Sequence, residues 1–315
     1  QAQVEGKFPG GGRENFVYLG PDRNRQEMKK LYGTGVALVT PFTEDLGVDF
    51  RALKKLLRHT AKGVDYYVVM GTTGESATLT PEEKKEVLRF VVENNEKKLP
   101  VVYGIGGNNT AEVLETIRHS DLGGVSALLS VSPYYNKPSQ QGIIQHFRKI
   151  ADLSPVPVIL YNVPGRTSSN LTAETTLELA NHQNIAGIKE ASGSLEQCMR
   201  IARGMPRDFL LISGDDLLTV PLYAIGARGV ISVLANAYPL AFRKMKDFAF
   251  AGNYPRASKE LFRLLDINGP MYEEGNPVGL KTLLSELGIT QPFVRLPLAA
   301  ASAGLRKRII SLSGL

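Results

Sequence analysis

The sequence predicts a (β/α)8 barrel, the TIM-barrel fold, followed by a C-terminal helical extension. Short apolar segments alternate with amphipathic helical segments from residue 35 onward, and eight strand segments occur before residue 236. These segments are continuously apolar, as expected of parallel strands that are covered on both faces. A doubly wound sheet is the competing arrangement, but the segment after the first strand, 39-VTPFTEDLG-47, lacks the Gly-rich dinucleotide fingerprint.

The helical segments lie between the strands, as a barrel requires. Segment 49–63 places three leucines at helical spacing. Segment 80–95 begins with Thr80 as a candidate cap, Pro81 at the first helical position and Glu83 where a capping box needs it. The expected strands are residues 35–42, 66–71, 100–106, 125–131, 156–163, 185–191, 208–215 and 229–235.

The composition divides the chain into three parts. Residues 1–32 contain a glycine run and no apolar signal-peptide core, so we expect a flexible N-terminal extension. Residues 33–236 form the expected (β/α)8 catalytic barrel. Residues 237–315 form the expected C-terminal helical extension, with helical patterns over 255–267 and 277–288.

Charge and cysteine content exclude several classes of function. Of the formal net charge of +6, +2 comes from residues 1–30 and +3 from residues 303–315, which leaves +1 for residues 31–302. No basic stripe is interleaved with aromatic residues, so we expect no nucleic-acid partner. No apolar run approaches the ~18 residues of a membrane span, so we expect no membrane partner. The single cysteine, Cys198, permits no disulfide within the chain and predicts a cytoplasmic protein.

The residues that end the strands carry the candidate chemistry, because a barrel's active site lies at the C-terminal ends of its strands. Lys189 directly follows an apolar strand, where burying an ammonium is costly unless it has a partner or a function. Strand alternation predicts that Ile185 and Gly187 share its inward face. The strand ends are 71-GTTGES-76, 132-SPYYNKP-138, 161-YNVPGRT-167, Lys189 and 213-SGDD-216.

These side chains predict a lysine nucleophile with a proton relay and a carboxylate site. Burial disfavours the charged form of a lysine, and a neutral amine can attack a carbonyl. Tyr161 ends the neighbouring strand and can exchange protons through Thr72, while Arg166 and the 71–75 loop suit a carboxylate. The alternatives are a rim lysine paired with a carboxylate, a tyrosine that only packs, and an arginine in a structural salt bridge.

No metal or cofactor is expected. The four histidines lack ligand spacing, and neither a P-loop nor a G-x-S-x-G elbow is present. The residues therefore predict a lysine-dependent enzyme that makes or breaks carbon–carbon bonds without a metal, acting on a small keto acid. The histidines are His59, His119, His146 and His182.

Five segments in this order resemble the dihydrodipicolinate synthase (4-hydroxy-tetrahydrodipicolinate synthase) family, a branch of the pyruvate-dependent class I aldolase superfamily. The resemblance extends from about residue 33 to 297. It implies a lyase that condenses pyruvate with L-aspartate 4-semialdehyde in lysine and diaminopimelate biosynthesis. The segments are 71-GTTGES-76, 133-PYYNKPSQQG-142, 159-ILYNVPGRT-167, 187-GIKEASG-193 and 213-SGDD-216.

The resemblance implies a role for each matching residue. Lys189 would form the Schiff base with pyruvate, and Tyr161 would move protons. Thr72 would connect Tyr161 to Tyr135, which in this family reaches in from the neighbouring subunit. Thr73 would hold the pyruvate carboxylate.

The second substrate and the assembly follow from the same resemblance. Arg166 would bind the carboxylate of aspartate semialdehyde, and Gly214 and Ile231 would contribute backbone contacts. Since Tyr135 acts from the partner, the resemblance implies a homodimer at least, usually a homotetramer.

Two alternative functions remain. N-acetylneuraminate lyase, a sister in the superfamily, shares the barrel, the lysine and the tyrosine, but Arg166 and the threonine at position 72, the second residue of 71-GTTGE-75, favour the synthase. A catalytically silent barrel that only binds a small acid would have lost Lys189 or Tyr161, and both are present.

Lysine-inhibited members of this family bind the effector at the dimer interface, and the matching residues here form a possible lysine effector site. The histidines that often line that site in enterobacterial relatives are replaced by Pro81 and Lys84. An ammonium at position 84 would repel a cationic effector, so we expect weak or absent inhibition by lysine. The matching residues are Ser76, Ala77, Asn108, Glu112 and Tyr134.

Overall fold

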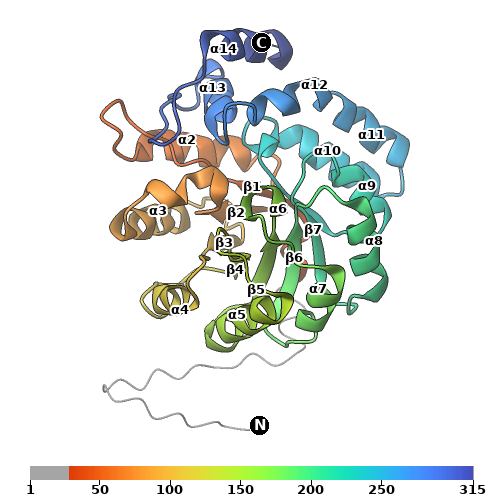
Figure 1. Cartoon of the computed structure of the whole chain (residues 1–315). Helices are drawn as coiled ribbons and strands as arrows, with labels where there is room; N and C mark the ends of the chain where they lie inside the picture. Colours follow the sequence, from red (N-terminus) through yellow and green to blue (C-terminus); the bar gives the residue numbers. More distant parts are fainter. Residues whose placement is uncertain (1–27, 315) are drawn as a thin grey trace.

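The protein forms a closed barrel of parallel strands, which confirms the predicted fold class (Figure 1). The computed structural model describes residues 28–314. Within this range eight strands pair in sequence order, and β1 closes the barrel by pairing with β8. The strands are β1 Gly33–Ala37, β2 Tyr66–Val69, β3 Val101–Gly104, β4 Ala127–Val131, β5 Val158–Asn162, β6 Ile185–Glu190, β7 Leu210–Ser213 and β8 Gly229–Ser232.

Helices surround the barrel and continue beyond it. Those between the strands are α2 Phe50–Thr60, α3 Pro81–Glu93, α4 Thr110–Arg118, α5 Gln140–Leu153, α6 Pro164–Thr167, α7 Ala173–Leu179, α8 Leu195–Gly204 and α9 Thr219–Ala224. Short 3-10 helices occupy Thr72–Gly74 (η1), Ser76–Thr78 (η2), Leu234–Asn236 (η3) and Gly269–Met271 (η4). After β8 come α10 Pro239–Phe250, α11 Tyr254–Phe262, α12 Leu265–Asn268, α13 Val278–Glu286 and α14 Ala303–Ser313.

Alternation along the strands produces two apolar cores. Val68, Leu129 and Ile212 point inward and fill the barrel. Their strand neighbours Val69 and Leu128 belong to the larger cluster that also contains the helices' apolar residues. Both faces of each strand are therefore buried, which explains the continuously apolar strand segments.

The barrel interior begins earlier in the chain than expected. Residues 1–27 of the expected flexible extension 1–32 lie outside the described residues. Met28 and Leu31 are buried and pack with the interior cluster. The last residues assigned to the extension therefore belong to the packed core, because their apolar side chains close the barrel interior.

The cap signals are confirmed at α3. The Thr80 side chain accepts from the Glu83 backbone N–H, and the Glu83 carboxylate accepts from the Thr80 N–H. Pro81 stands at the first helical position, where its missing N–H is not needed. The reciprocal hydrogen bonds between Thr80 and Glu83 fix the point at which the loop after β2 ends and α3 begins.

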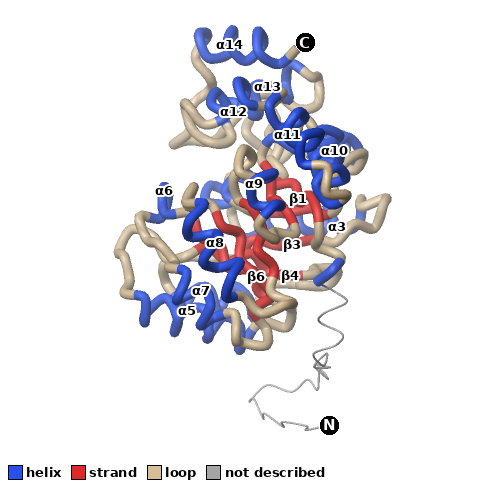
Figure 2. The backbone as a smooth tube through the Cα atoms, turned by 90° about the vertical axis from the view of Figure 1, so that its right-hand side faces the viewer, coloured by secondary structure: helices blue, strands red, loops and turns tan. Residues whose placement is uncertain are grey.

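The C-terminal helices lie against one side of the barrel (Figures 1 and 2). The pattern over 255–267 forms two helices, α11 and α12, with a turn at Leu264, whose side chain is buried. In α13 every residue from Val278 to Leu284 is buried, as in a helix covered on all sides. Arg306 and Arg308 of α14 form ion pairs with Glu286 and Glu273, respectively.

The register of β6 decides where its lysine points. Val158 pairs with Ile185 but Ile159 pairs with Gly187, so Ala186 is an extra residue in the strand. Ile185 consequently packs in the outer cluster, and the expectation that it shares the inward face of Lys189 is wrong. Gly187 does face inward with Lys189, as expected.

We expect Gly187→Ala to destabilise the protein by about 1–3 kcal/mol through overpacking. A Cβ at this position would lie 2.5 Å from the Leu210 carbonyl oxygen on β7, and backbone cannot move aside without disturbing the barrel. Urea unfolding measures the change. Gly269→Ala is the matched control, since a Cβ there meets nothing within 4 Å and its backbone is helical. Equal unfolding midpoints for both variants and the parent would contradict this.

Candidate active site

The candidate site lies at the C-terminal ends of the strands, where the chain turns sharply. Met70, Glu75, Tyr135 and Ser168 all have positive φ angles and follow β2, β4 and β5. Such conformations are unfavourable for residues other than glycine and persist only where the surrounding structure holds them. They collect at functional sites, which directs attention to this end of the barrel.

Lys189 and Tyr161 are brought together by strand pairing. Tyr161 on β5 is the register partner of Lys189 on β6, and the Lys189 Nζ lies 4.3 Å from the Tyr161 ring centre. Both side chains are buried. No carboxylate among residues 28–314 forms an ion pair with Lys189. The alternative interpretation, a solvated lysine at the rim that is paired with one of these carboxylates, is therefore wrong.

The neighbouring strands leave room for the lysine and supply an acid. A Cβ on Gly214 would lie 2.5 Å from the Ala191 Cβ and 3.1 Å from the Lys189 Cε, so a side chain at position 214 would clash with β6's end and crowd the lysine. Ile231 on β8 is buried in the same interior cluster. Asp216 is buried, its Oδ2 accepts from the Leu234 N–H at 2.8 Å, and burial raises its pKa to about 6.

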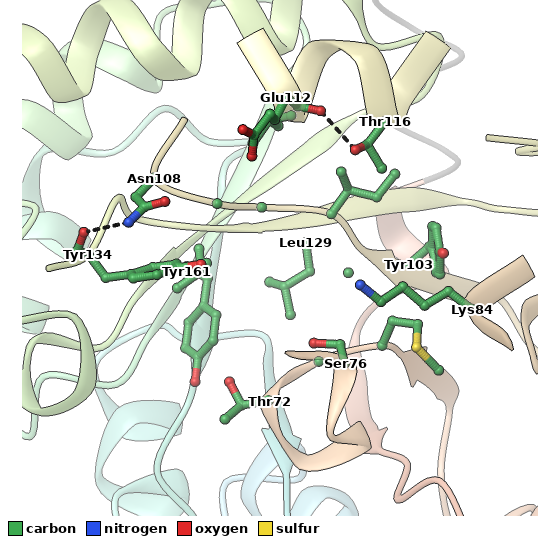
Figure 3. A pocket seen from close by; sticks show the side chains of 18 of the residues that line it. Thr72, Ser76, Lys84, Tyr103, Asn108, Glu112, Thr116, Leu129, Tyr134 and Tyr161 are labelled. Carbon is green, nitrogen blue, oxygen red and sulfur yellow. Dashed lines mark hydrogen bonds between the residues drawn. The ribbon is translucent and has the colours of Figure 1, made fainter. Parts of the chain in front are cut away.

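The 71–75 loop forms η1 and presents both threonines at the mouth. Figure 3 shows the Tyr161 phenol pointing toward Thr72, as the expected relay requires. Thr72 is exposed, whereas Thr73 is buried and its Oγ1 accepts from the Asn276 side-chain amide at 3.1 Å. No hydrogen bond joins Tyr161 and Thr72, both of which line the same cavity, so the proton relay stays a prediction.

Arg166 is held at the rim by the short helix α6, directly after β5. Its side chain is exposed, and no ion pair joins it to another residue within 28–314, so the structural salt bridge is not formed there. Tyr272 is buried near enough to Arg166, Asp215 and Asp216 to interact with their charges. Burial first, and then these acids, raise the pKa of Tyr272, while the guanidinium lowers it.

Tyr135 is not brought into the mouth of its own chain. It is 89% exposed with a φ of 68°, and it does not line the cavity described below. Tyr134 is also partly exposed, and its carbonyl accepts from the Asn108 side chain at 3.2 Å. The only catalytic candidate that the single chain leaves outside is thus the one expected to act from a partner.

A cavity of about 250 Å³ extends from Thr72 and Tyr161 toward α3 and α4 (Figure 3). Four of the five possible effector residues line it, and exposed Ala77 does not. Lys84 also lines it, and burial lowers the pKa of its ammonium. The lining residues from the expected effector set are Ser76, Asn108, Glu112 and Tyr134.

Sequence reasoning missed contributions from the C-terminal region. Asn276 and Tyr272 reach the mouth although they lie far along the chain from the loops they contact. Nothing in their local sequence marks them, since the expected helical extension carried no catalytic motif. Asp216 stood within the quoted 213-SGDD-216 segment, and its burial could be found only in three dimensions.

No cluster of metal-ligating side chains occurs in the described part of the chain. In the same range, no helix has both the length and the apolar character needed to cross a bilayer.

The fold and site together define a (β/α)8-barrel enzyme with a buried lysine at the mouth. The chain belongs to the dihydrodipicolinate synthetase family, whose sequence pattern matches residues 30–312. A 4-hydroxy-tetrahydrodipicolinate synthase from Cytophaga hutchinsonii is 52% identical over 283 residues, covering 90% of this chain and 95% of that protein. This membership supports the synthase over the lyase and the silent barrel.

Two solved structures extend the similarity to three dimensions. A dihydrodipicolinate synthase from Cyanidioschyzon merolae, solved with lysine bound, is 40% identical with a TM-score of 0.86, covering 90% of this chain and 97% of that chain. One from Acinetobacter baumannii, solved in complex with pyruvate, is 35% identical with a TM-score of 0.87, covering 90% of this chain and 98% of that chain.

Proposed function

We propose that this enzyme condenses pyruvate with L-aspartate 4-semialdehyde to give 4-hydroxy-tetrahydrodipicolinate, in lysine and diaminopimelate biosynthesis. The observation that carries the proposal is the buried Lys189 amine beside the Tyr161 ring, without a carboxylate partner in the described range. The pyruvate complex of the Acinetobacter relative supports the choice of the first substrate. A cytoplasmic location is part of the proposal, supported by the free, buried Cys198.

The first half of the reaction forms a Schiff base. The Lys189 amine attacks the C2 carbonyl of pyruvate, and Tyr161 delivers the protons that let water leave. Thr73 donates to the pyruvate carboxylate. The protonated imine withdraws electrons from C3, so a methyl proton leaves and an enamine forms.

The second half forms the carbon–carbon bond and releases the product. The enamine C3 attacks the aldehyde carbon of aspartate semialdehyde, whose carboxylate is held by the Arg166 fork. The aldehyde oxygen takes up a proton and becomes the 4-hydroxyl. The amino group of the second substrate then attacks C2, the Lys189 amine leaves, and the ring closes.

The active enzyme is proposed to be a homodimer or a homotetramer. Tyr135, exposed on its own chain, would enter the partner's mouth and continue the relay from Tyr161 through Thr72. Burying such a large aromatic side chain at an interface also favours association.

Borohydride reduction in the presence of pyruvate tests the Schiff base. We expect a stable adduct on the peptide that contains Lys189, because reduction of the imine makes the bond permanent. Peptide mass mapping locates it, and Lys189→Met should abolish it. Modification elsewhere, or no adduct on the parent protein, would overturn the proposed function.

Mixing two inactive variants tests the contribution of Tyr135 from the partner. A mixture of the separate Tyr135→Phe and Lys189→Met proteins should be much more active than either protein alone. The reason is that a mixed dimer contains one site with an intact lysine and an intact tyrosine from the partner. Thr72→Val combined with Lys189→Met is the control. In the control each change disables the site of its own chain, so a mixed dimer has no intact site and no recovery is expected. A failure of the first pair to recover activity after subunit exchange would contradict action from the partner.

We expect weak or no inhibition by lysine, since the Lys84 ammonium lines the cavity that an effector would occupy. Lys84→His should produce or strengthen inhibition, measured as the lysine concentration that halves the rate. The neighbouring Lys85→His is the control, because Lys85 is exposed and does not line the cavity. Tight inhibition of the parent enzyme at micromolar lysine would show this expectation to be wrong.

A further inference from the structure

The C-terminal region holds the loop between β2 and α3 at several points. The Asn276 amide donates to the Thr73 hydroxyl at 3.1 Å. The Lys281 Nζ lies 2.5 Å from the Glu75 Oε1, and the Arg295 backbone N–H donates to the Glu75 Oε2 at 3.1 Å. The residues thus joined are more than 200 positions apart in the chain.

The contact at Glu75 anchors the loop firmly. Lys281 is fully buried in α13, donates to the Phe293 carbonyl at 2.8 Å, and lies 3.9 Å from the centre of the Phe42 ring. Glu75 itself is buried and has a left-handed backbone with a φ of 53°. Since a buried charge left without its partner is strongly unfavourable, this ion pair fixes the loop's path relative to α13.

The contact at Thr73 does more than hold the loop, because it sets the polarity of a hydroxyl. A threonine hydroxyl has one proton to donate and lone pairs that accept. The Asn276 amide donates to Thr73 and therefore occupies an acceptor position. The hydroxyl proton remains available for another group, which suits an anionic partner at the mouth. Both side chains are buried, so water competes little for these positions.

The Asn276 side chain also retains an unused group. Its Oδ1 is buried and has no hydrogen-bond partner in the described range. A buried acceptor without a partner is unfavourable and is uncommon unless it serves a function. The donor that Asn276 offers to Thr73 therefore offsets the cost of leaving its buried Oδ1 without a partner.

We propose that Asn276 is a positioning residue that turns the Thr73 hydroxyl into an obligate donor toward the substrate carboxylate. The proposal rests on the proposed function, in which Thr73 binds the pyruvate carboxylate. The Glu75–Lys281 pair keeps the loop where this contact can form. The C-terminal helical region thereby takes part in binding the first substrate, without touching the substrate itself.

Asn276→Asp reverses the polarity that the proposal requires. A carboxylate accepts, so the Thr73 proton would turn toward position 276, and a negative charge would stand near the substrate's own. We expect the KM for pyruvate to rise at least about tenfold, in line with loss of a hydrogen bond to a charged group. The KM for aspartate semialdehyde should stay within about twofold, because Arg166 is unchanged.

The matched control is Asn184→Asp. Asn184 likewise donates through its side-chain amide, to the carbonyls of Ala151 and Ser154, but it precedes β6 at the opposite end of the barrel. The same substitution there should lower the unfolding midpoint without raising the KM for pyruvate. If only Asn276→Asp raises the KM for pyruvate, the rise is caused by the changed hydrogen-bond polarity at the mouth and not by a general loss of stability.

A double-mutant cycle with Thr73→Val gives the sharper test. If Asn276 acts through the Thr73 hydroxyl, Asn276→Asp should add less than about twofold to the KM for pyruvate once that hydroxyl is absent. The proposal would be overturned if Asn276→Asp raised the KM for pyruvate as much in the Thr73→Val protein as in the parent. It would also be overturned if Asn276→Asp alone left the KM for pyruvate unchanged. If Asn276→Asp does not fold, Asn276→Ala carries the same cycle, with a smaller expected rise of about threefold.

Borohydride trapping separates this inference from the proposed function. If the parent protein forms no pyruvate adduct on Lys189, the proposed function fails, and the positioning role fails with it. If the parent forms the adduct and Asn276→Asp needs no more pyruvate than the parent to form it, only the positioning role is overturned. Trapping of Asn276→Asp that needs at least about tenfold more pyruvate supports it.

Discussion

The structure depends first on closure of a parallel barrel with one defined register. Closure brings the ends of all eight strands to the same face, so groups distant in sequence share one mouth. Between β5 and β6 the register places Lys189 opposite Tyr161. The extra residue Ala186 lies earlier in β6 and turns Ile185 outward while Gly187 and Lys189 remain inside. Without closure and this pairing, the amine would have no neighbouring ring and no shared pocket.

Two buried lysines show how the same side chain serves different ends. Lys281 is paired with Glu75 and bonded to the Phe293 carbonyl, and breaking such a buried pair typically costs about 3–5 kcal/mol. Lys189 has a tyrosine ring and a glycine beside it, and no carboxylate within the described range pairs with it. A paired ammonium holds structure, whereas an unpaired amine next to an open mouth is available for chemistry. Lys281 anchors the 71–75 loop through Glu75, and Thr72 of that loop lines the same cavity as Tyr161, whose ring lies beside the Lys189 amine.

Much of this organisation could be predicted from local patterns. The eight strands, the α3 capping box and the mouth residues follow from apolar runs, turn residues and the rule that barrel sites lie at strand ends. The face of Ile185 could not be predicted, because one inserted residue reverses alternation and leaves no mark in the sequence. Asn276 could not be found either, since its contact with Thr73 spans 203 positions.

The sequence by itself determined the fold class, the family and the choice of Lys189 as candidate nucleophile, because these depend on periodicity and on motifs that are contiguous in the chain. Only the tertiary structure decided which side chains support that nucleophile. It placed Met28 and Leu31 in the barrel core and brought Asp216, Tyr272 and Asn276 to the mouth. The physical reason is that burial and hydrogen-bond polarity belong to the packed molecule, in which the last helices fold back on a loop formed near its beginning.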